Sequence, residues 1–485
     1  MINLKTTTAA WLRRGSAAFA GMAMLASGAA YAEGINTFYS FVGGIDGAFP
    51  YGTPVAGTDG FLYGSTYFGS ETSTDPYTGY GTVYKIKPDG SKRTTLHVFS
   101  GSGADGGIPI APLLLGADGN YYGSTEGSSD FAAAPYGTIF KIKTNGTFTT
   151  LHTFAGTDGR FVTGKLVQAA DGKLYGVTQA GGTYDFGVVF SMKTDGSKFT
   201  VLHEFTGADG YSPVQGLTLG ADGKLYGTAS YGGVSGMGTV FSLKTNGKNF
   251  ATLYHFPGSG DGGNPYSQLV QGSDGYFYGS TNAGGGSCGC GTVFKIDTAG
   301  NLTTLHRFSG GTDGSAPREG MVIDASGAIY GTTYNGGSVG AGAAYKIGTD
   351  GTLLGLISFE NVNGLPTGFT AGADGTLYSS SIFGGANNVG ALFSVDPTSA
   401  FVLPAVPVTT LTSDKTSVSG KETATLTWSS SDADSCEASG DWSGTAPTSG
   451  SKKVLPAGRG THSYTMTCSG AGGSASATVT VIKTK

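Results

Sequence analysis

The chain has 485 residues, of which 38% are hydrophobic and only 13% are charged, and 87 are glycine. Its 11% of aromatic residues argues against a disordered glycine-rich chain, and its length allows more than one folded domain. The formal net charge is −5, with dispersed charges. Because a mildly acidic chain repels nucleic acid phosphates and anionic lipid, we expect neither as a partner.

The first 32 residues have the pattern of a secretory signal peptide. A basic start is followed by an apolar stretch over residues 17–26, which is too short and too rich in glycine to span a membrane. Cleavage is predicted between Ala32 and Glu33, which leaves 25 Lys and Arg against 33 Asp and Glu, a net charge of −8. We expect a secreted protein, in the periplasm or outside the cell, with no membrane insertion and with its four cysteines paired.

One short segment, in which Tyr precedes a small residue, recurs seven times at intervals of 48–59 residues. This interval is typical of the blades of a β-propeller. Six copies follow Asp-Gly, a pair that suits a tight hairpin between two strands. The repeated tyrosines are Tyr63, Tyr122, Tyr175, Tyr226, Tyr278, Tyr330 and Tyr378.

Each period contains four segments with the alternation of a β-strand. The fourth type, Leu-His-x-Phe and its variants, follows only the first six copies, and a seventh version stands ahead of them at residues 37–41. We therefore predict an all-β seven-bladed β-propeller over residues 33–400, closed by pairing of residues 36–41 with 391–395. In the alternative pairing, residues 401–403 occupy that edge.

The pattern Leu-Tyr-Gly-Thr, Gly-Gly, Gly-Thr-Val-Phe, which is carried for example by residues 225–228, 232–233 and 238–241, resembles the choice-of-anchor tandem repeats called GloVer. The resemblance covers residues 36–396. It implies an exported or surface-associated bacterial protein of unknown biochemical role, with a C-terminal sorting signal. Residues 478–485 contain no hydrophobic tail, which argues against sorted attachment to the surface.

The glycine repeat stops near a Pro-rich linker, residues 401–410, and alternating runs over residues 411–485 predict a small immunoglobulin-like β-sandwich. Cys436 and Cys468 are placed to form a disulfide in it. Its expected role is that of a spacer. The alternative is carbohydrate binding through an exposed Trp442.

Three sets of repeated residues are expected to have mainly structural roles. The tyrosines are expected in the core, with hydroxyls satisfied locally and the next glycine admitting the neighbouring blade. Histidines at one fourth-strand position lie too far apart to share a metal, so we expect no metal site: His97, His152, His203 and His306. The carboxylates of a second Asp-Gly series have two possible roles. They either accept backbone N–H groups within their own loops, or line one opening of the propeller and there hold Ca²⁺ or polarise a substrate. The series consists of Asp46, Asp105, Asp158, Asp209, Asp261 and Asp313.

The least repetitive segments are the long loops between second and third strands of the first two blades, residues 67–80 and 126–136. Aromatic side chains with nearby carboxylates suit sugar faces and hydroxyls, although these rings could also merely cover the blades. The predicted ligand-binding residues are Tyr67, Phe68, Asp75, Tyr77, Tyr80, Asp130, Phe131 and Tyr136.

Cys288 and Cys290 lie in the corresponding loop of the fifth blade. A Cys-x-Cys pair without a nearby partner pair or histidine does not make a zinc site. We expect either a loop-stabilising disulfide or a strained, redox-active one. No catalytic triad signature or phosphate-binding loop is present in the sequence, and we expect no catalytic residue and no cofactor.

The sequence thus predicts an exported, non-catalytic binding or scaffold protein whose propeller contacts a glycan or protein ligand through loops on one face. One alternative is a propeller lyase or glycosidase that uses Asp75 or Asp130 and acts on an extracellular polysaccharide. A second alternative is a structural matrix or adhesion protein.

Overall fold

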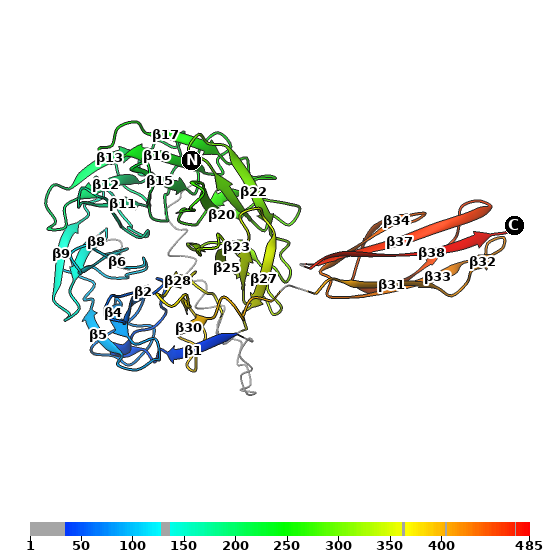
Figure 1. Cartoon of the computed structure of the whole chain (residues 1–485), viewed down its shortest axis with the longest axis horizontal. Coiled ribbons are helices and arrows are strands. Elements are labelled where there is room, and N and C mark those ends of the chain that lie inside the picture. Colours follow the sequence, from blue (N-terminus) through cyan, green and yellow to red (C-terminus); the bar gives the residue numbers. More distant parts are fainter. Residues whose placement is uncertain (1–33, 128–135, 361–363, 403–404, 471) are drawn as a thin grey trace.

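The computed structural model describes residues 34–127, 136–360, 364–402, 405–470 and 472–485 (Figure 1). Every regular element of this part is a β-strand except one short 3-10 helix, η1 (Gly44–Asp46). Within the described ranges, no helix has the length and apolar character needed to cross a membrane. The predicted cleavage site, Ala32 and Glu33, and the loop residues Asp130 and Phe131 lie outside the described residues.

Seven small antiparallel sheets occupy the described chain from residue 35 to residue 395 and form a propeller-like ring (Figure 1). Figure 1 shows the first strands of these sheets toward the centre and the fourth strands at the rim. Sheet by sheet, the strands are β2 (Val55–Ala56), β3 (Leu62–Thr66), β4 (Thr82–Ile86) and β5 (Thr94–Val98); β6 (Leu114–Leu115), β7 (Tyr121–Thr125), β8 (Thr138–Ile142) and β9 (Phe148–Thr153); β10 (Val167–Gln168), β11 (Leu174–Thr178), β12 (Val188–Met192) and β13 (Thr200–Glu204); β14 (Thr218–Leu219), β15 (Lys224–Ala229), β16 (Thr239–Lys244) and β17 (Ala251–His255); β18 (Gly263–Pro265), β19 (Val270–Gln271), β20 (Phe277–Ala283), β21 (Thr292–Ile296) and β22 (Leu302–Arg307); β23 (Ser315–Pro317), β24 (Val322–Ile323), β25 (Ile329–Asn335), β26 (Ala343–Ile347) and β27 (Leu353–Ser358); and β28 (Thr370–Ala371), β29 (Leu377–Ser381), β30 (Ala391–Val395) and β1 (Ile35–Ser40).

The last sheet combines both ends of the repeat region. Strand β1 pairs antiparallel with β30, with Ile35 opposite Val395 and Ser40 opposite Ala391. The predicted closure by the N-terminal strand is therefore confirmed. The alternative pairing is wrong, because Val402 pairs instead with Leu356 on the rim strand β27 of the preceding sheet.

The repeated tyrosines lie in the core, as predicted. In the third sheet Tyr175 is fully buried and its hydroxyl donates to Asp171 over 2.8 Å, across the hairpin turn that precedes its strand. Since a buried hydroxyl without a partner is costly, this local acceptor lets a tyrosine occupy the core. The same bond joins Tyr63 to Asp59, Tyr122 to Asp118, Tyr226 to Asp222, Tyr278 to Asp274 and Tyr330 to Asp324.

The glycine that follows six of the seven tyrosines has a different role from the predicted one. Gly176 pairs with Phe190 on the third strand of its own sheet, and a Cβ at Gly176 would lie 2.6 Å from Cζ of that ring. The glycine therefore makes room for an aromatic ring of its own sheet and not for the neighbouring sheet. Its repetition follows from packing across one strand pair.

A single backbone hydrogen bond recurs at every joint between neighbouring sheets. The donor is a non-glycine residue with positive φ that stands three residues after the Asp of the second Asp-Gly series, or at the matching place in the last sheet. The acceptor is the carbonyl two residues before the third strand of the previous sheet. The N···O distances lie between 2.7 and 3.4 Å. The pairs are Phe49 to Val389, Ile108 to Tyr80, Phe161 to Tyr136, Ser212 to Phe186, Asn264 to Met237, Ala316 to Cys290 and Leu365 to Ala341.

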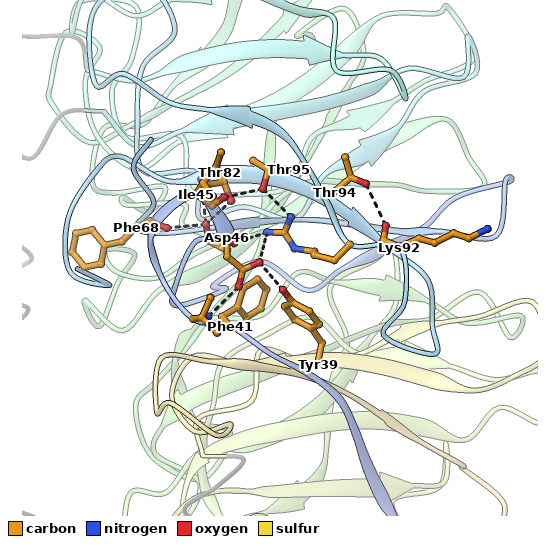
Figure 2. A network of polar contacts seen from close by, with 12 residues as sticks. Tyr39, Phe41, Ile45, Asp46, Phe68, Thr82, Lys92, Thr94 and Thr95 are labelled. Atoms are coloured by element: carbon orange, nitrogen blue, oxygen red, sulfur yellow. Dashed lines mark hydrogen bonds and ion pairs between the residues drawn. The ribbon is translucent and has the colours of Figure 1, made fainter. Parts of the chain in front are cut away.

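At the joint between the last and first sheets, an ionic network connects the two sheets (Figure 2). Arg93 of the first sheet forms an ion pair with Asp46 over 3.3 Å, and its guanidinium lies 4.7 Å from the ring centroid of Tyr84. Tyr39 of β1 donates to the same carboxylate over 2.6 Å. Thr95 donates to the carbonyl of Ile45 over 2.8 Å. These contacts fasten the N-terminal strand to the first sheet.

The C-terminal region forms two further sheets around its own core, which includes Leu426, Trp428, Tyr464 and Met466. One sheet contains β31 (Val408–Ser413), β33 (Ala424–Ser431) and β36 (Ser449–Val454). The other contains β32 (Ser417–Val418), β38 (Gly473–Lys483), β37 (Gly460–Gly470), β34 (Ser435–Gly440) and β35 (Gly444–Ala446).

A disulfide joins Cys436 to Cys468, which stand opposite each other on β34 and β37 of one sheet. Trp442 is only 7% exposed, and its Nε1 donates to the carbonyl of Thr465 over 3.0 Å. The expectation of an exposed Trp442 is wrong, because its ring packs edge-on against Trp428 in the core.

The joint bond makes a prediction at Ala316, whose φ is 55°. Ala316→Gly should keep the bond and relieve the left-handed strain, so the free energy of unfolding should stay equal or rise by up to about 1 kcal/mol. Ala316→Pro removes the N–H and forbids positive φ, and should lower the free energy of unfolding by about 3 kcal/mol or more. Urea unfolding of both variants measures this. Equal stabilities would contradict the role of the bond.

The closure network makes a second prediction. Arg93→Ala should lower the free energy of unfolding by about 3–5 kcal/mol, because it removes one partner of a buried ion pair. Arg93→Leu should cost less, since Leu302 and Leu353 occupy the same repeat position in other sheets. The control is Lys143→Ala at an exposed position. An Arg93→Ala protein as stable as this control would refute the assignment.

Candidate functional site

The predicted binding loop after β3 forms a small aromatic cluster. Phe68 and Tyr77 both contact Phe49, at centroid distances of 5.9 and 5.4 Å. Tyr77 is 58% exposed. The exposed Asp75 accepts the backbone N–H of Tyr77 over 3.0 Å, so its carboxylate supports the loop itself. The structure therefore brings these four residues together.

Tyr80 and Tyr136 lie elsewhere, at two joints between sheets. Their carbonyls accept the joint bonds from Ile108 and Phe161. Their half-buried rings pack against the cores between neighbouring sheets. These two tyrosines thus contribute to the assembly of the ring and do not join the cluster around Phe49.

A second group of side chains gathers where first and second strands meet toward the centre of the ring. Because these strands are antiparallel, the segment before the first and the end of the second lie at the same end of each sheet. This is also the end that carries the long loops. We call this group the axial cluster, and it consists of Tyr51, Tyr67, Glu126, Tyr266, Arg318 and Tyr334.

The axial cluster joins sheets that are not neighbours. The rings of Tyr51 and Tyr67, both from the first sheet, lie 5.2 Å apart. Tyr51 also lies close enough to Tyr334 and Arg318 of the sixth sheet to interact with them electrostatically, although the last sheet stands between. Burial raises the pKa of Tyr51 and Tyr67 well above the usual range, so both remain neutral hydroxyls.

Arg318 lies between two aromatic rings. Its guanidinium carbon is 4.6 Å from the centroid of Tyr334 and 5.6 Å from that of Tyr266. Such contacts stabilise a guanidinium without neutralising it. Its Nε is buried and has no hydrogen-bond partner. This nitrogen is therefore an unsatisfied donor.

Two carboxyl groups at this end of the ring have a pKa close to neutral pH. Glu126 and Glu319 keep part of their surface exposed but are surrounded by protein on most sides, and this burial raises the pKa of each to about 7. Arg318 opposes the shift of Glu319. Burial also lowers the pKa of Lys165. At neutral pH both carboxyls therefore exist partly as neutral hydrogen-bond donors.

The histidine and aspartate series, predicted as separate sets, are partners at the rim. His152 bonds to Asp158 over 2.9 Å, and the same carboxylate accepts the backbone N–H of Ala155. The imidazole also stacks on Phe199 of the next sheet, at a centroid distance of 3.8 Å. The local role predicted for the aspartates is thus observed. The other pairs are His97 with Asp105, His203 with Asp209, His306 with Asp313, Tyr39 with Asp46 and Tyr254 with Asp261.

The remaining sequence candidates occupy a loop of the fifth sheet. Cys288 and Cys290 form a disulfide in the loop between β20 and β21. The carbonyl of Cys290 accepts the joint bond from Ala316, so this disulfide lies beside a sheet joint. No group of three His, Cys, Asp or Glu residues within the described ranges is arranged to hold a metal ion.

Sequence reasoning identified Tyr67 as a site residue and missed Tyr51, Tyr266, Arg318 and Tyr334. A usable signal was present, because these residues stand at two repeat positions that vary widely among the seven copies. The position of Tyr51 holds Ile110, Thr163, Val214, Tyr266, Arg318 and Thr367 in the other copies. Variation at a position that the fold places toward the axis marks residues that ring symmetry does not require.

The rim pairs predict a pH effect on stability. Burial lowers the pKa of His97 and His203 despite their aspartate partners, so the unfolded chain binds more protons and stability falls as the pH drops below about 6.5. A double variant with His97→Tyr and His203→Tyr copies the pairing of Tyr254 and removes this titration. Its melting temperature should fall less than that of the parent between about pH 7.5 and about pH 5.5. An equal fall in both proteins would contradict the argument.

The comparisons identify a repeat family and a fold. The family model described as the Gloeobacter/Verrucomicrobia repeat matches residues 26–221 and 215–427. No curated protein matches the sequence. The extracellular domain of the putative hybrid two-component system BT3049 from B. thetaiotaomicron aligns with a TM-score of 0.53 at 13% identity, over 94% of this chain and 58% of that one. This likeness shows the fold alone, and the chain spans little more than half of that structure's length.

A further solved structure is less similar. PorZ, a bacterial surface component of the type-IX secretion system of Porphyromonas gingivalis, aligns with a TM-score of 0.45 at 12% identity. The alignment covers 92% of this chain and 61% of that one.

Proposed function

We propose that this chain, which belongs to the Gloeobacter/Verrucomicrobia repeat family, is an exported, non-catalytic binding protein that recognises a glycan at the axial cluster. In this proposal residues 33–400 form a seven-bladed β-propeller, residues 401–410 a linker, and residues 411–485 an immunoglobulin-like β-sandwich that acts as a spacer. The seven sheets and their seven joint bonds support the propeller assignment. The two disulfides suit an oxidising, extracytoplasmic environment.

One observation carries the binding proposal. Aromatic and charged side chains from non-neighbouring sheets come close enough to interact electrostatically at one end of the ring, at two positions that vary widely among the copies. Tyrosine rings offer apolar faces with hydroxyl groups beside them, which is the combination that sugar rings contact. The cluster around Phe49, with Phe68 and Tyr77, lies on the same loop end and would extend the surface toward a longer chain.

A glycan array with the mature protein tests this proposal. The Tyr51→Ala and Tyr67→Ala variants should each weaken binding to any recognised glycan by about 5–30-fold, because each removes an aromatic contact worth about 1–2 kcal/mol. Tyr184→Ala is the matched control, since Tyr184 is 57% exposed on the third sheet and outside the axial cluster. Binding that survives both axial substitutions would move the site to the loop around Phe49.

Absence of binding to every glycan would favour the structural matrix or adhesion role. It would also leave a protein ligand to be sought with the same variants. Absence of binding to every glycan would in both cases reject the glycan proposal.

A second candidate function rests on Glu126 and Glu319. Glycosidases and lyases use carboxyl groups whose pKa lies near the working pH, and burial brings both of these to about 7. The enzyme alternative therefore fits these residues better than the exposed Asp75. Turnover of a recognised polysaccharide that is lost in Glu126→Gln or Glu319→Gln, while binding persists, would establish it in place of the binding role.

A further inference from the structure

Arg318 differs from every equivalent residue of the repeat. The other six copies have Tyr, Ile, Thr or Val at this position, so the sixth sheet alone places a cation there. The arginine is not needed to assemble a blade, because six blades assemble without it. Its presence requires another explanation.

The surroundings of Arg318 supply no anion. Among the described residues, no Asp or Glu lies within ion-pair distance of its guanidinium, and its Nε is buried without an acceptor. The adjacent Glu319 is largely desolvated and is only partly ionised near neutral pH. Leaving a buried donor unpaired costs about 1–3 kcal/mol, and more when the group is charged. An arrangement of this cost calls for an explanation, such as a bound water, ion or ligand.

A second unpaired donor belongs to the neighbouring sheet. The side-chain nitrogen of Asn282, at the end of β20, is buried and has no partner. Asn282 occupies the repeat position that Tyr334 holds in the sixth sheet and Tyr67 in the first. The neighbouring fifth and sixth sheets therefore each carry one buried donor without a partner, and the rings of Tyr266 and Tyr334 lie close to the arginine.

We propose that Arg318 and Asn282 bind the carboxylate of an acidic sugar residue, such as a uronic acid, while Tyr266 and Tyr334 hold the guanidinium in place. This inference rests on the proposed glycan-binding function and specifies its ligand class. The planar guanidinium matches the two oxygens of a carboxylate. A single cation balances the single charge of a carboxylate. A phosphate carries more charge and would meet only one guanidinium in a protein with a net charge of −8 after signal removal.

Calorimetric titration of the mature protein with short galacturonate oligomers, their methyl esters and galactose oligomers tests the proposal. The free acids should bind, and esterification should weaken binding about tenfold or more, because it removes a charge-assisted hydrogen bond. This comparison changes only the ligand and does not depend on the folding of a variant. Equal binding of acid and ester would overturn the inference and leave glycan binding intact.

The protein-side test uses Arg318→Gln and Arg318→Lys. Arg318→Gln should weaken galacturonate binding about 10–100-fold and weaken any binding of galactose oligomers much less, and Arg318→Lys should fall between it and the parent. The matched control is Arg307→Gln, an exposed arginine on the rim strand β22. Loss of both ligands in Arg318→Gln, with an unchanged melting temperature, would indicate a general role and contradict carboxylate recognition.

Two further outcomes separate the proposals. If no oligosaccharide binds, the proposed glycan-binding function fails together with this inference. If a peptide with a free C-terminus binds and its amidated form does not, while galacturonate is ignored, Arg318 recognises a carboxylate but the ligand is a protein. That result would also overturn the acidic-sugar assignment.

Discussion

The ring depends on one backbone hydrogen bond that is repeated at each sheet joint. Its donor residue takes a positive φ, which costs a non-glycine residue about 1–2 kcal/mol. The bond offsets this cost because it satisfies a donor and an acceptor that would otherwise be buried unpaired, at about 1–3 kcal/mol each. Since only main-chain atoms take part, residues as different as Phe49, Asn264 and Ala316 can occupy the donor position. The joint is therefore constant while its side chains vary.

The side chains at the rim of each joint differ from one joint to the next, although the backbone bond is constant. His97, His152 and His203 stack on an aromatic ring of the next sheet and bond to an aspartate of the connecting loop. Where the chain closes on itself, Arg93 replaces that ring and adds an ion pair with Asp46 (Figure 2). In the last sheet no hairpin connects β30 to β1, so β1 is held to its own sheet by strand pairing. A stronger side-chain contact at the closing joint holds the N-terminal strand in place.

The same separation between constant backbone and variable side chains locates the candidate site. Strand pairing and core packing restrict the repeated tyrosines and glycines, so these positions carry no information about a ligand. The positions of Tyr51 and Tyr67 face fewer such restrictions and differ from sheet to sheet. Tyr266, Arg318 and Tyr334 occupy these positions on adjoining sheets and lie close together. The proposed binding residues therefore lie at positions where the copies of the repeat differ.

The sequence by itself determined the all-β class, the number of repeats and the closure by the N-terminal strand, because strand alternation, turn residues and copy number are local or countable properties. It also placed the repeated tyrosines in the core. Only the tertiary structure decided that Gly176 accommodates Phe190, that the histidines and aspartates pair, and that Trp442 is buried. The convergence of Tyr51 with Arg318 likewise required coordinates. These residues are far apart in the chain and on sheets that are not neighbours, so their proximity follows from ring geometry, which no local pattern records.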